Sequence, residues 1–101
     1  MVRITVFRLY SAEEAVRLVE EPSLLSKRIR ADRQRDPSAV IETWDSAEAA
    51  AMVTLLSTAF GVVVMDIEHA SEHLPDAHPL VDQGRAMVRE AERLVAAKDD
   101  T

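Results

Sequence analysis

Residues 62–67, Val-Val-Val-Met-Asp-Ile, form an almost continuous apolar run, and Gly61 comes directly before it. A run of this kind, rich in β-branched residues, is typical of a strand whose two faces are both covered. We therefore predict a sheet with this segment as its central strand. A chain of 101 residues has room for one hydrophobic core, so residues 1–101 are expected to form a single small domain.

Two further segments have the pattern of strands. Residues 2–6 alternate between apolar and polar side chains, which suits a strand with one buried face, and this alternation slips at residues 7–9. Residues 39–44 follow a turn at residues 36–38 and contain several β-branched or aromatic side chains. They are predicted to form a strand, although the same residues could extend a helix.

Helix start signals lie between these segments. Ser11 and Glu14 have the spacing of a capping box, and Pro22 suits the first turn of a second helix that ends near residue 35. Residues 45–48, Asp-Ser-Ala-Glu, offer a second N-cap and an acid in the first turn of a helix that continues to residue 60, and Gly61 is where a C′ glycine would end it. After residue 79, apolar or small residues recur at steps of four and three, which predicts a long amphipathic helix. They are Leu80, Gly84, Met87, Ala91 and Leu94.

The resulting order of elements is β-α-α-β-α-β-α. It predicts an α/β fold with a small, three-stranded, mostly parallel sheet, right-handed crossovers and a long C-terminal amphipathic helix. An α+β arrangement of the ferredoxin-like type is the alternative.

Charge is distributed unevenly along the chain, although the net charge is −6. Residues 1–35 contain eight Lys and Arg against five acids, whereas residues 36–84 contain nine acids and no Lys or Arg. One basic segment is a candidate surface for binding a partner, and its bases are Lys27, Arg28, Arg30, Arg33 and Arg35. These bases could contact phosphates, which makes a DNA-binding regulator one alternative function, or they could pair with the acidic half as a solvated helix face.

The string Glu68-His69-Ala70-Ser71-Glu72-His73 matches the H-x-x-E-H spacing of inverted zincins. On a helix, His69 and His73 would share one face and could bind a metal ion, with Glu72 placed as a base. A second hypothesis is a catalytic site without metal, formed by Asp66, Glu68 and His69 at the carboxyl end of the predicted central strand. A small enzyme or metal-binding protein is therefore another alternative, but no recognisable catalytic signature occurs, so catalytic residues stay unassigned and no cofactor is expected.

Composition limits the compartment and the partners. The chain has no cysteine, which excludes disulfides and thiolate chemistry and fits a reducing compartment. Its first residues lack the apolar segment of a signal peptide, and no apolar run reaches membrane-spanning length. A cytoplasmic protein that does not bind membranes is the expectation.

Apolar helix surface suggests what the protein does. The predicted helix over residues 47–60 is apolar on nearly every side, and the four-three repeat from Leu80 to Leu94 resembles the pattern of a coiled-coil seam. We therefore predict a non-enzymatic protein-interaction module that binds another protein, itself as a homodimer, or both. Immunity proteins, antitoxins, inhibitors and adaptors are modules of this type. Packing of the same surface within one chain is the alternative.

Overall fold

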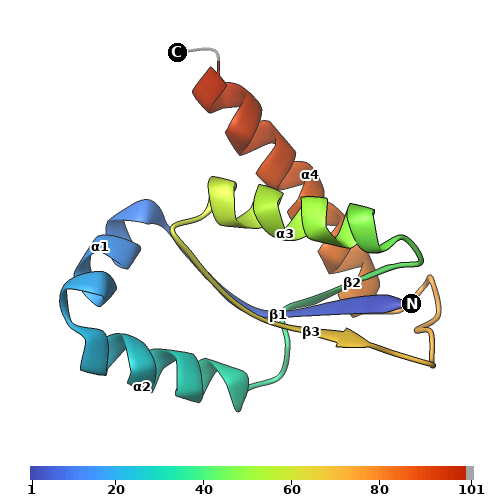
Figure 1. The fold of residues 1–101 in the computed structure, drawn as a ribbon, viewed down its shortest axis with the longest axis horizontal. Coiled ribbons are helices and arrows are strands. Elements are labelled where there is room, and N and C mark those ends of the chain that lie inside the picture. The colour runs from blue at the N-terminus through green and yellow to red at the C-terminus, as the bar shows by residue number, and fades with distance from the viewer. Residues whose placement is uncertain (100–101) are drawn as a thin grey trace.

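The computed structural model describes residues 1–99, and its elements follow one another in the predicted order (Figure 1). They are β1 (Val2–Tyr10), α1 (Ala12–Glu20), α2 (Pro22–Arg33), β2 (Ala39–Thr43), α3 (Ser46–Ala59), β3 (Val62–His69) and α4 (Pro79–Asp99). The long C-terminal helix is confirmed as α4. None of the helices in residues 1–99 is both long enough and apolar enough to cross a bilayer.

The sheet is antiparallel with the strand order β2-β1-β3, so the prediction of a mostly parallel sheet is wrong and the fold is α+β. Val2 faces Thr43 on one side and His69 on the other, and both neighbouring strands run against β1. The reason lies in the connection from β1 to β2, because a crossover helix that returns to the starting end of a strand gives a parallel neighbour. Here α1 and α2 bring the chain back to the sheet beside the second half of β1, where the amide of Ser38 donates to the backbone oxygen of Val6 (Figure 1). β2 therefore begins opposite Val6 and runs toward the start of β1.

The central strand is β1 and not β3, which corrects a second prediction. Ile4 of β1 pairs with Ile41 of β2 and with Ile67 of β3, so β3 lies at an edge of the sheet. β2, α3 and β3 form a split β-α-β unit, because β1 lies between two strands that are parallel to each other. The apolar residues of β3 therefore pack on both faces of the sheet, although one of the two hydrogen-bonding sides of the strand has no neighbour.

The side chains of β1 change face at a β-bulge between Val6 and Arg8. This irregularity coincides with the slip in alternation that the sequence shows at residues 7–9. Before the bulge, Val6 belongs to the main core, and after it Tyr10 belongs to a second core on the opposite face. The extra residue shifts the alternation by one position, so that Val6 before the bulge and Leu9 after it both face the main core.

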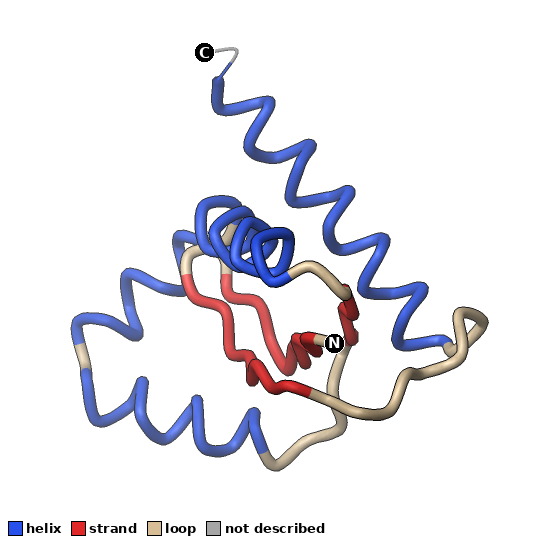
Figure 2. The backbone as a smooth tube through the Cα atoms, turned by 45° about the vertical axis from the view of Figure 1, so that its right-hand side comes forward, coloured by secondary structure: helices blue, strands red, loops and turns tan. Residues whose placement is uncertain are grey.

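Helices cover both faces of the sheet, with α3 on one side of the strands and α2 on the other (Figures 1 and 2). The main core lies under α3 and α4 and includes Ile4, Val6 and Leu56, which are fully buried. The second core lies against α1 and α2 and contains Tyr10 and Leu18. Burial of apolar surface on both faces is the main contribution to the stability of such a domain.

Helix α4 packs against β2 and covers the edge of the sheet opposite β3. Gly84 is buried there, and a Cβ atom at this position would lie 2.2 Å from the backbone oxygen of Val40. A glycine is therefore required for the close approach of helix and strand. The predicted capping box is confirmed, since Ser11 forms it completely with Glu14. The N-cap predicted within residues 45–48 is Asp45, whose side chain accepts a hydrogen bond from the amide of Ala47.

Gly61 follows α3 as predicted, but it does not end the helix through a left-handed conformation. No glycine among the described residues has a positive φ, and the C-cap residue Phe60 is extended. A Cβ atom at Gly61 would lie 2.6 Å from the Cβ atom of Ala15 and 2.8 Å from the backbone oxygen of Ser11. The glycine is needed because the start of β3 passes close to the start of α1.

Candidate functional site

The outer edge of β3 is open. Its inner side pairs with β1, and no segment within residues 1–99 forms backbone hydrogen bonds with its outer side. The strand is eight residues long, and its first four residues are Val62, Val63, Val64 and Met65. Proteins usually protect such an edge with charges, proline or a short strand, because its free backbone groups can pair with another strand. The first half of β3 has none of these protections.

A shallow apolar groove runs between β3 and α3, next to this open edge. It has a volume of about 500 Å³, and its lining includes Val2, Ala50, Val53 and Ile67. Ile67 faces α3 from the edge strand, yet 55% of its surface is exposed. The groove therefore leads from the main core to Ile67, a large apolar side chain that remains partly exposed in a single chain.

The exposed surface of α3 beside this groove carries almost no charge. Glu48 is the one charged residue of the helix, and its carboxylate accepts a hydrogen bond of 3.2 Å from the hydroxyl of Thr43. The hydroxyls of Thr54 and Thr58 donate to backbone oxygens one turn earlier in the same helix, at 3.1 and 2.8 Å. These two side chains need no outside partner for their hydroxyl protons. The other exposed residues of α3 are small and uncharged: Ser46, Ala47, Ala50, Ala51, Thr54, Ser57 and Thr58.

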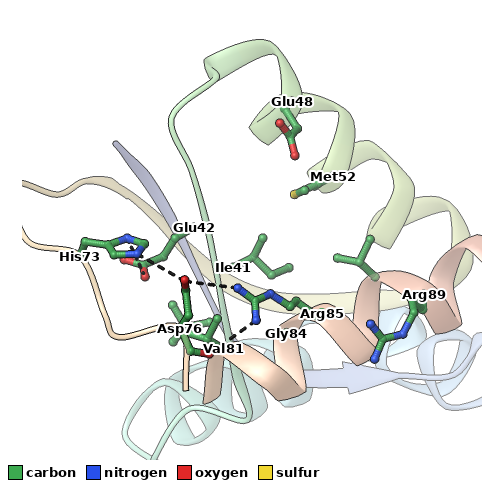
Figure 3. A pocket seen from close by; sticks show the side chains of 12 residues that line it. Ile41, Glu42, Glu48, Met52, His73, Asp76, Val81, Gly84, Arg85 and Arg89 are labelled. Carbon is green, nitrogen blue, oxygen red and sulfur yellow. Dashed lines mark hydrogen bonds and ion pairs between the residues drawn. The ribbon is translucent and has the colours of Figure 1, made fainter. Parts of the chain in front are cut away.

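A second candidate site is a pocket of about 360 Å³ between β2, α3, α4 and the loop over residues 70–78. Figure 3 shows Glu42, His73 and Asp76 at one end of this pocket and Arg85 and Arg89 on α4. Its floor is apolar and consists of Val40, Ile41, Met52, Val81 and Val88. A pocket with an apolar floor and a few convergent polar groups is the usual form of a small-molecule site.

The polar end of this pocket is a network around Glu42, whose side chain is only 3% exposed. Its carboxylate accepts hydrogen bonds of 3.0 Å from Arg3 Nε and from the backbone amide of Leu74. His73 Nδ1 lies 3.5 Å from Glu42 and Nε2 lies 3.7 Å from Asp76, so the imidazole stands between two carboxylates. Arg3 also donates to the backbone oxygen of Glu72 at 2.6 Å.

In this pocket the carboxylate of Glu42 is already engaged by Arg3 and by the amide of Leu74. The ring of His73 also stacks on the ring of Trp44, with centroids 6.3 Å apart. These contacts all join the loop over residues 70–78 to the β1–β2 part of the sheet, so the network fastens this loop in place.

The predicted metal ligands are not brought together as the sequence pattern suggested. His69 is the last residue of β3 and lines the groove beside α3, whereas Glu72 and His73 lie in the following loop. These residues do not form a helix, so the i, i+4 geometry assumed for His69 and His73 is absent. Among residues 1–99, no cluster of three or more His, Asp or Glu side chains has the geometry of a metal site.

The structure also does not support the hypothesis of a metal-free site at the end of β3. Asp66 forms an ion pair with Arg33 of α2, and Glu68 lies 3.6 Å from Arg3. The rule that places ligands at the carboxyl ends of strands applies to parallel sheets, and this sheet is antiparallel. Asp66 and Glu68 therefore belong to contacts that hold α2 and β1 against β3.

The predicted basic segment forms the end of α2 and the turn after it. All of its five bases are exposed. Arg30 and Arg33 line one hollow, Arg28 lines a second and Arg35 a third, and Arg33 also pairs with Asp66. The structure thus brings Arg30 and Arg33 together and places Arg28 and Arg35 at other hollows.

The predicted seam of α4 faces the interior of the chain to a large extent. Gly84 and Ala91 are buried, and Leu80, Met87 and Leu94 are partly buried. Gly84 lies against the backbone of β2, and Met87 and Ala91 belong to the main core. This row of residues therefore packs within a single chain over much of its length.

Sequence reasoning missed the open edge of β3, because it placed this strand at the centre of the sheet. One signal was present: the apolar run is interrupted by Asp66 and ends with Glu68 and His69, which are typical of an exposed edge. It also missed Glu42, whose partners lie 39 and 32 residues away in the chain. Comparison of this chain with models of protein families, with curated proteins and with solved structures finds no match.

Proposed function

We propose that the protein is a non-enzymatic interaction module whose first partner is a second copy of itself, bound through β3 and α3. The observation that supports this proposal most strongly is the open, apolar outer edge of β3. A dimer of this kind fits an immunity, antitoxin, inhibitor or adaptor protein, with another protein as its second partner. The absence of cysteine agrees with work in a reducing compartment such as the cytoplasm.

The sequence of β3 suits antiparallel pairing with itself. If the two-fold axis passes at Met65, Val63 of each copy lies opposite Ile67 of the other on the α3 side of the sheet. Registers centred on Asp66 or Ile67 would instead place carboxylates directly opposite one another, which is unfavourable. The register at Met65 avoids this contact and joins the two sheets into one of six strands.

Helix α3 supports the same arrangement. A two-fold axis at β3 would bring the α3 helices of the two copies side by side on one face of the joined sheet. Their exposed residues carry no charge apart from Glu48, so identical copies would not repel each other there. Small residues such as Ala50 and Thr54 also let two helices approach closely. Ile67 and the groove beside it would then be covered, which adds apolar burial to the backbone pairing.

The first prediction concerns Ile67. We expect the wild type to sediment at twice the mass of the 11.2 kDa chain. Ile67→Lys places a charge opposite the apolar Val63 of the other copy in the proposed interface, and we expect this variant to sediment as a monomer at the same micromolar concentration. Because Ile67 is 55% exposed within one chain, the variant should still fold. Circular dichroism and thermal unfolding would verify its fold.

The matched control is Val16→Lys. Val16 lies on α1 and is 58% exposed, so the same substitution is made at similar exposure but away from β3. We expect this control to remain a dimer. A monomeric wild type across the micromolar range would overturn the proposal, as would equal dissociation of both variants. Backbone pairing has its own readout, since amides on the outer side of β3 should exchange with solvent more slowly as protein concentration rises.

A further inference from the structure

Three arginine side chains from three different elements line one hollow on the α1–α2 side of the sheet. Arg8 comes from β1, Arg17 from α1 and Arg28 from α2, and the hollow has a volume of about 250 Å³. Tyr10, Leu18, Leu24 and Glu14 complete its lining. Residues that lie 20 positions apart in the chain are thus brought to one place by the fold.

The β-bulge of β1 places Arg8 in this hollow. In a regular strand Arg8 would lie on the same face as Val6, which is fully buried in the main core. The extra residue at the bulge turns Arg8 to the face of Tyr10, and its guanidinium carbon lies 4.9 Å from the centroid of the Tyr10 ring. This cation–π contact with the ring positions the guanidinium group of Arg8, and its N–H donors can point into the hollow.

None of these three arginines forms an ion pair within residues 1–99. Four other arginines of the described chain are paired with carboxylates: Arg3, Arg33, Arg85 and Arg93. Glu14 is the single acid in the lining, and its Oε1 accepts from the backbone amide and the hydroxyl of Ser11 in the capping box. The lining of the hollow therefore holds three guanidinium groups against one carboxylate. The carboxylate of Asp32 lies behind the lining, where it accepts the hydrogen bond of the Tyr10 hydroxyl, so the lining itself keeps an excess of positive charge.

We propose that this hollow binds a small molecule with one or two phosphate groups. A phosphate monoester carries a charge of about −1.5 to −2 near neutral pH, which matches the excess charge of the lining. Arginine is the side chain best suited to hold phosphate oxygens, because its planar group can donate two parallel hydrogen bonds. Leu18 and Leu24 offer an apolar wall for a short organic group attached to the phosphate.

Size and overall charge favour a small ligand over a nucleic acid. A volume of about 250 Å³ is below the range of about 300–1,000 Å³ that is usual for drug-sized ligands. An extended polyanion would also approach the rest of the protein, and the chain as a whole has a net charge of −6, which would repel it. No residue of β3 or α3 lines this hollow, so it is formed within one chain and does not require the proposed dimer.

The test is a calorimetric titration of the full chain at low ionic strength with three probes: inorganic phosphate, pyrophosphate and phenyl phosphate. Preference for phenyl phosphate would indicate an organic phosphate, and preference for pyrophosphate an inorganic or diphosphate group. We expect Arg17→Gln and Arg28→Gln each to weaken binding of the preferred probe by about tenfold, the effect of losing one charge-assisted hydrogen bond. Both residues are exposed, so both variants should keep the fold, which circular dichroism would verify.

The matched control is Arg30→Gln, which removes the same charge from α2 but lines a different hollow. Its affinity should change by less than about twofold, as expected for an exposed charge at a distance. Equal weakening by Arg30→Gln would show diffuse attraction and overturn the proposal. It would also be overturned by the absence of binding to all three probes at millimolar concentration. A short single-stranded DNA that binds more tightly than every probe, and is weakened by all three substitutions, would assign the arginines to nucleic acid instead.

Discussion

Tyr10 and Asp32 form a buried hydrogen bond that joins the central strand to α2. The hydroxyl of Tyr10 donates to the carboxylate of Asp32, and each residue is only 3% exposed. Among the residues that the structure describes, Asp32 receives a hydrogen bond to its carboxylate from Tyr10 alone. A buried carboxylate without a donor is costly, so this one hydroxyl stabilises the packing of α2 on the sheet.

Removing this hydroxyl should therefore destabilise the protein. We expect Tyr10→Phe to lower the free energy of unfolding by about 1–3 kcal/mol, because the carboxylate of Asp32 would be left buried without its partner. Urea unfolding followed by circular dichroism would measure the change. In an Asp32→Leu background the same substitution should cost much less, since no buried acceptor remains. Equal losses in both backgrounds would show that the hydrogen bond contributes nothing.

The same residue predicts a pH dependence. Burial raises the pKa of Tyr10 above its ordinary value of 10.0, and the hydrogen bond to Asp32 and the charge of that carboxylate raise the pKa further. The folded protein thus holds this proton more tightly than the unfolded chain does. Its contribution to stability is complete below about pH 10 and is lost as the pH rises through the folded pKa.

Wild type should therefore lose stability above pH 10 more steeply than Tyr10→Phe, which lacks the titrating group. Urea unfolding of both proteins at a series of alkaline pH values would measure this difference. The chain has a single tyrosine, so absorbance of the phenolate follows Tyr10 directly. A tyrosine that titrates at its ordinary pKa in the folded protein would contradict the prediction.

Sequence reasoning at the residue scale succeeded where the relevant partners are near in the chain. The capping box of Ser11 and Glu14 and the cap at Asp45 depend on contacts within a few residues, and both were predicted. No contact was predicted for Glu42, Asp32 or Arg8, because the residues around each of them come from other helices and strands. Asp32 is 22 residues from Tyr10, and nothing in the local sequence distinguishes it from a solvated acid.

At the scale of elements, the close contact between α4 and β2 depends on Gly84. Alanine usually favours a helix over glycine, but here its Cβ atom would lie 2.2 Å from a backbone oxygen that cannot rotate away. We expect Gly84→Ala to lower the free energy of unfolding by about 1–3 kcal/mol through overpacking. Thermal and urea unfolding would measure it.

The neighbouring variant Gln83→Ala is the control, because Gln83 is exposed on the same helix. Its stability should stay the same or rise slightly, as helix propensity predicts. If Gly84→Ala were to leave stability unchanged while separating a dimer, Gly84 would be an interface residue as the sequence pattern first suggested. The four-three repeat itself does not distinguish these cases, because a helix that packs on its own sheet and one that packs on a partner share the same periodicity.

For the whole molecule, the sequence predicted the order of elements but not the order of strands. Periodicity and helix caps show where each element lies along the chain, and these assignments agree with the structure. The direction of β2 depends on how α1 and α2 turn in space, which no residue pattern records. Because β3 was placed at the centre of the sheet, the candidate interface at its outer edge was not predicted. Composition does not separate the two positions, since an edge strand with two covered faces is as apolar as a central strand.

One edge of the sheet lies under α4, and the other edge is open. A sheet with two open edges could add copies without limit and grow into a fibre, as amyloid does. In the proposed dimer each sheet would accept one neighbour at β3, and the far edge of that neighbour would be covered by its own α4. Growth through β3 would therefore stop after a single addition, and the C-terminal helix would limit the proposed assembly to two subunits.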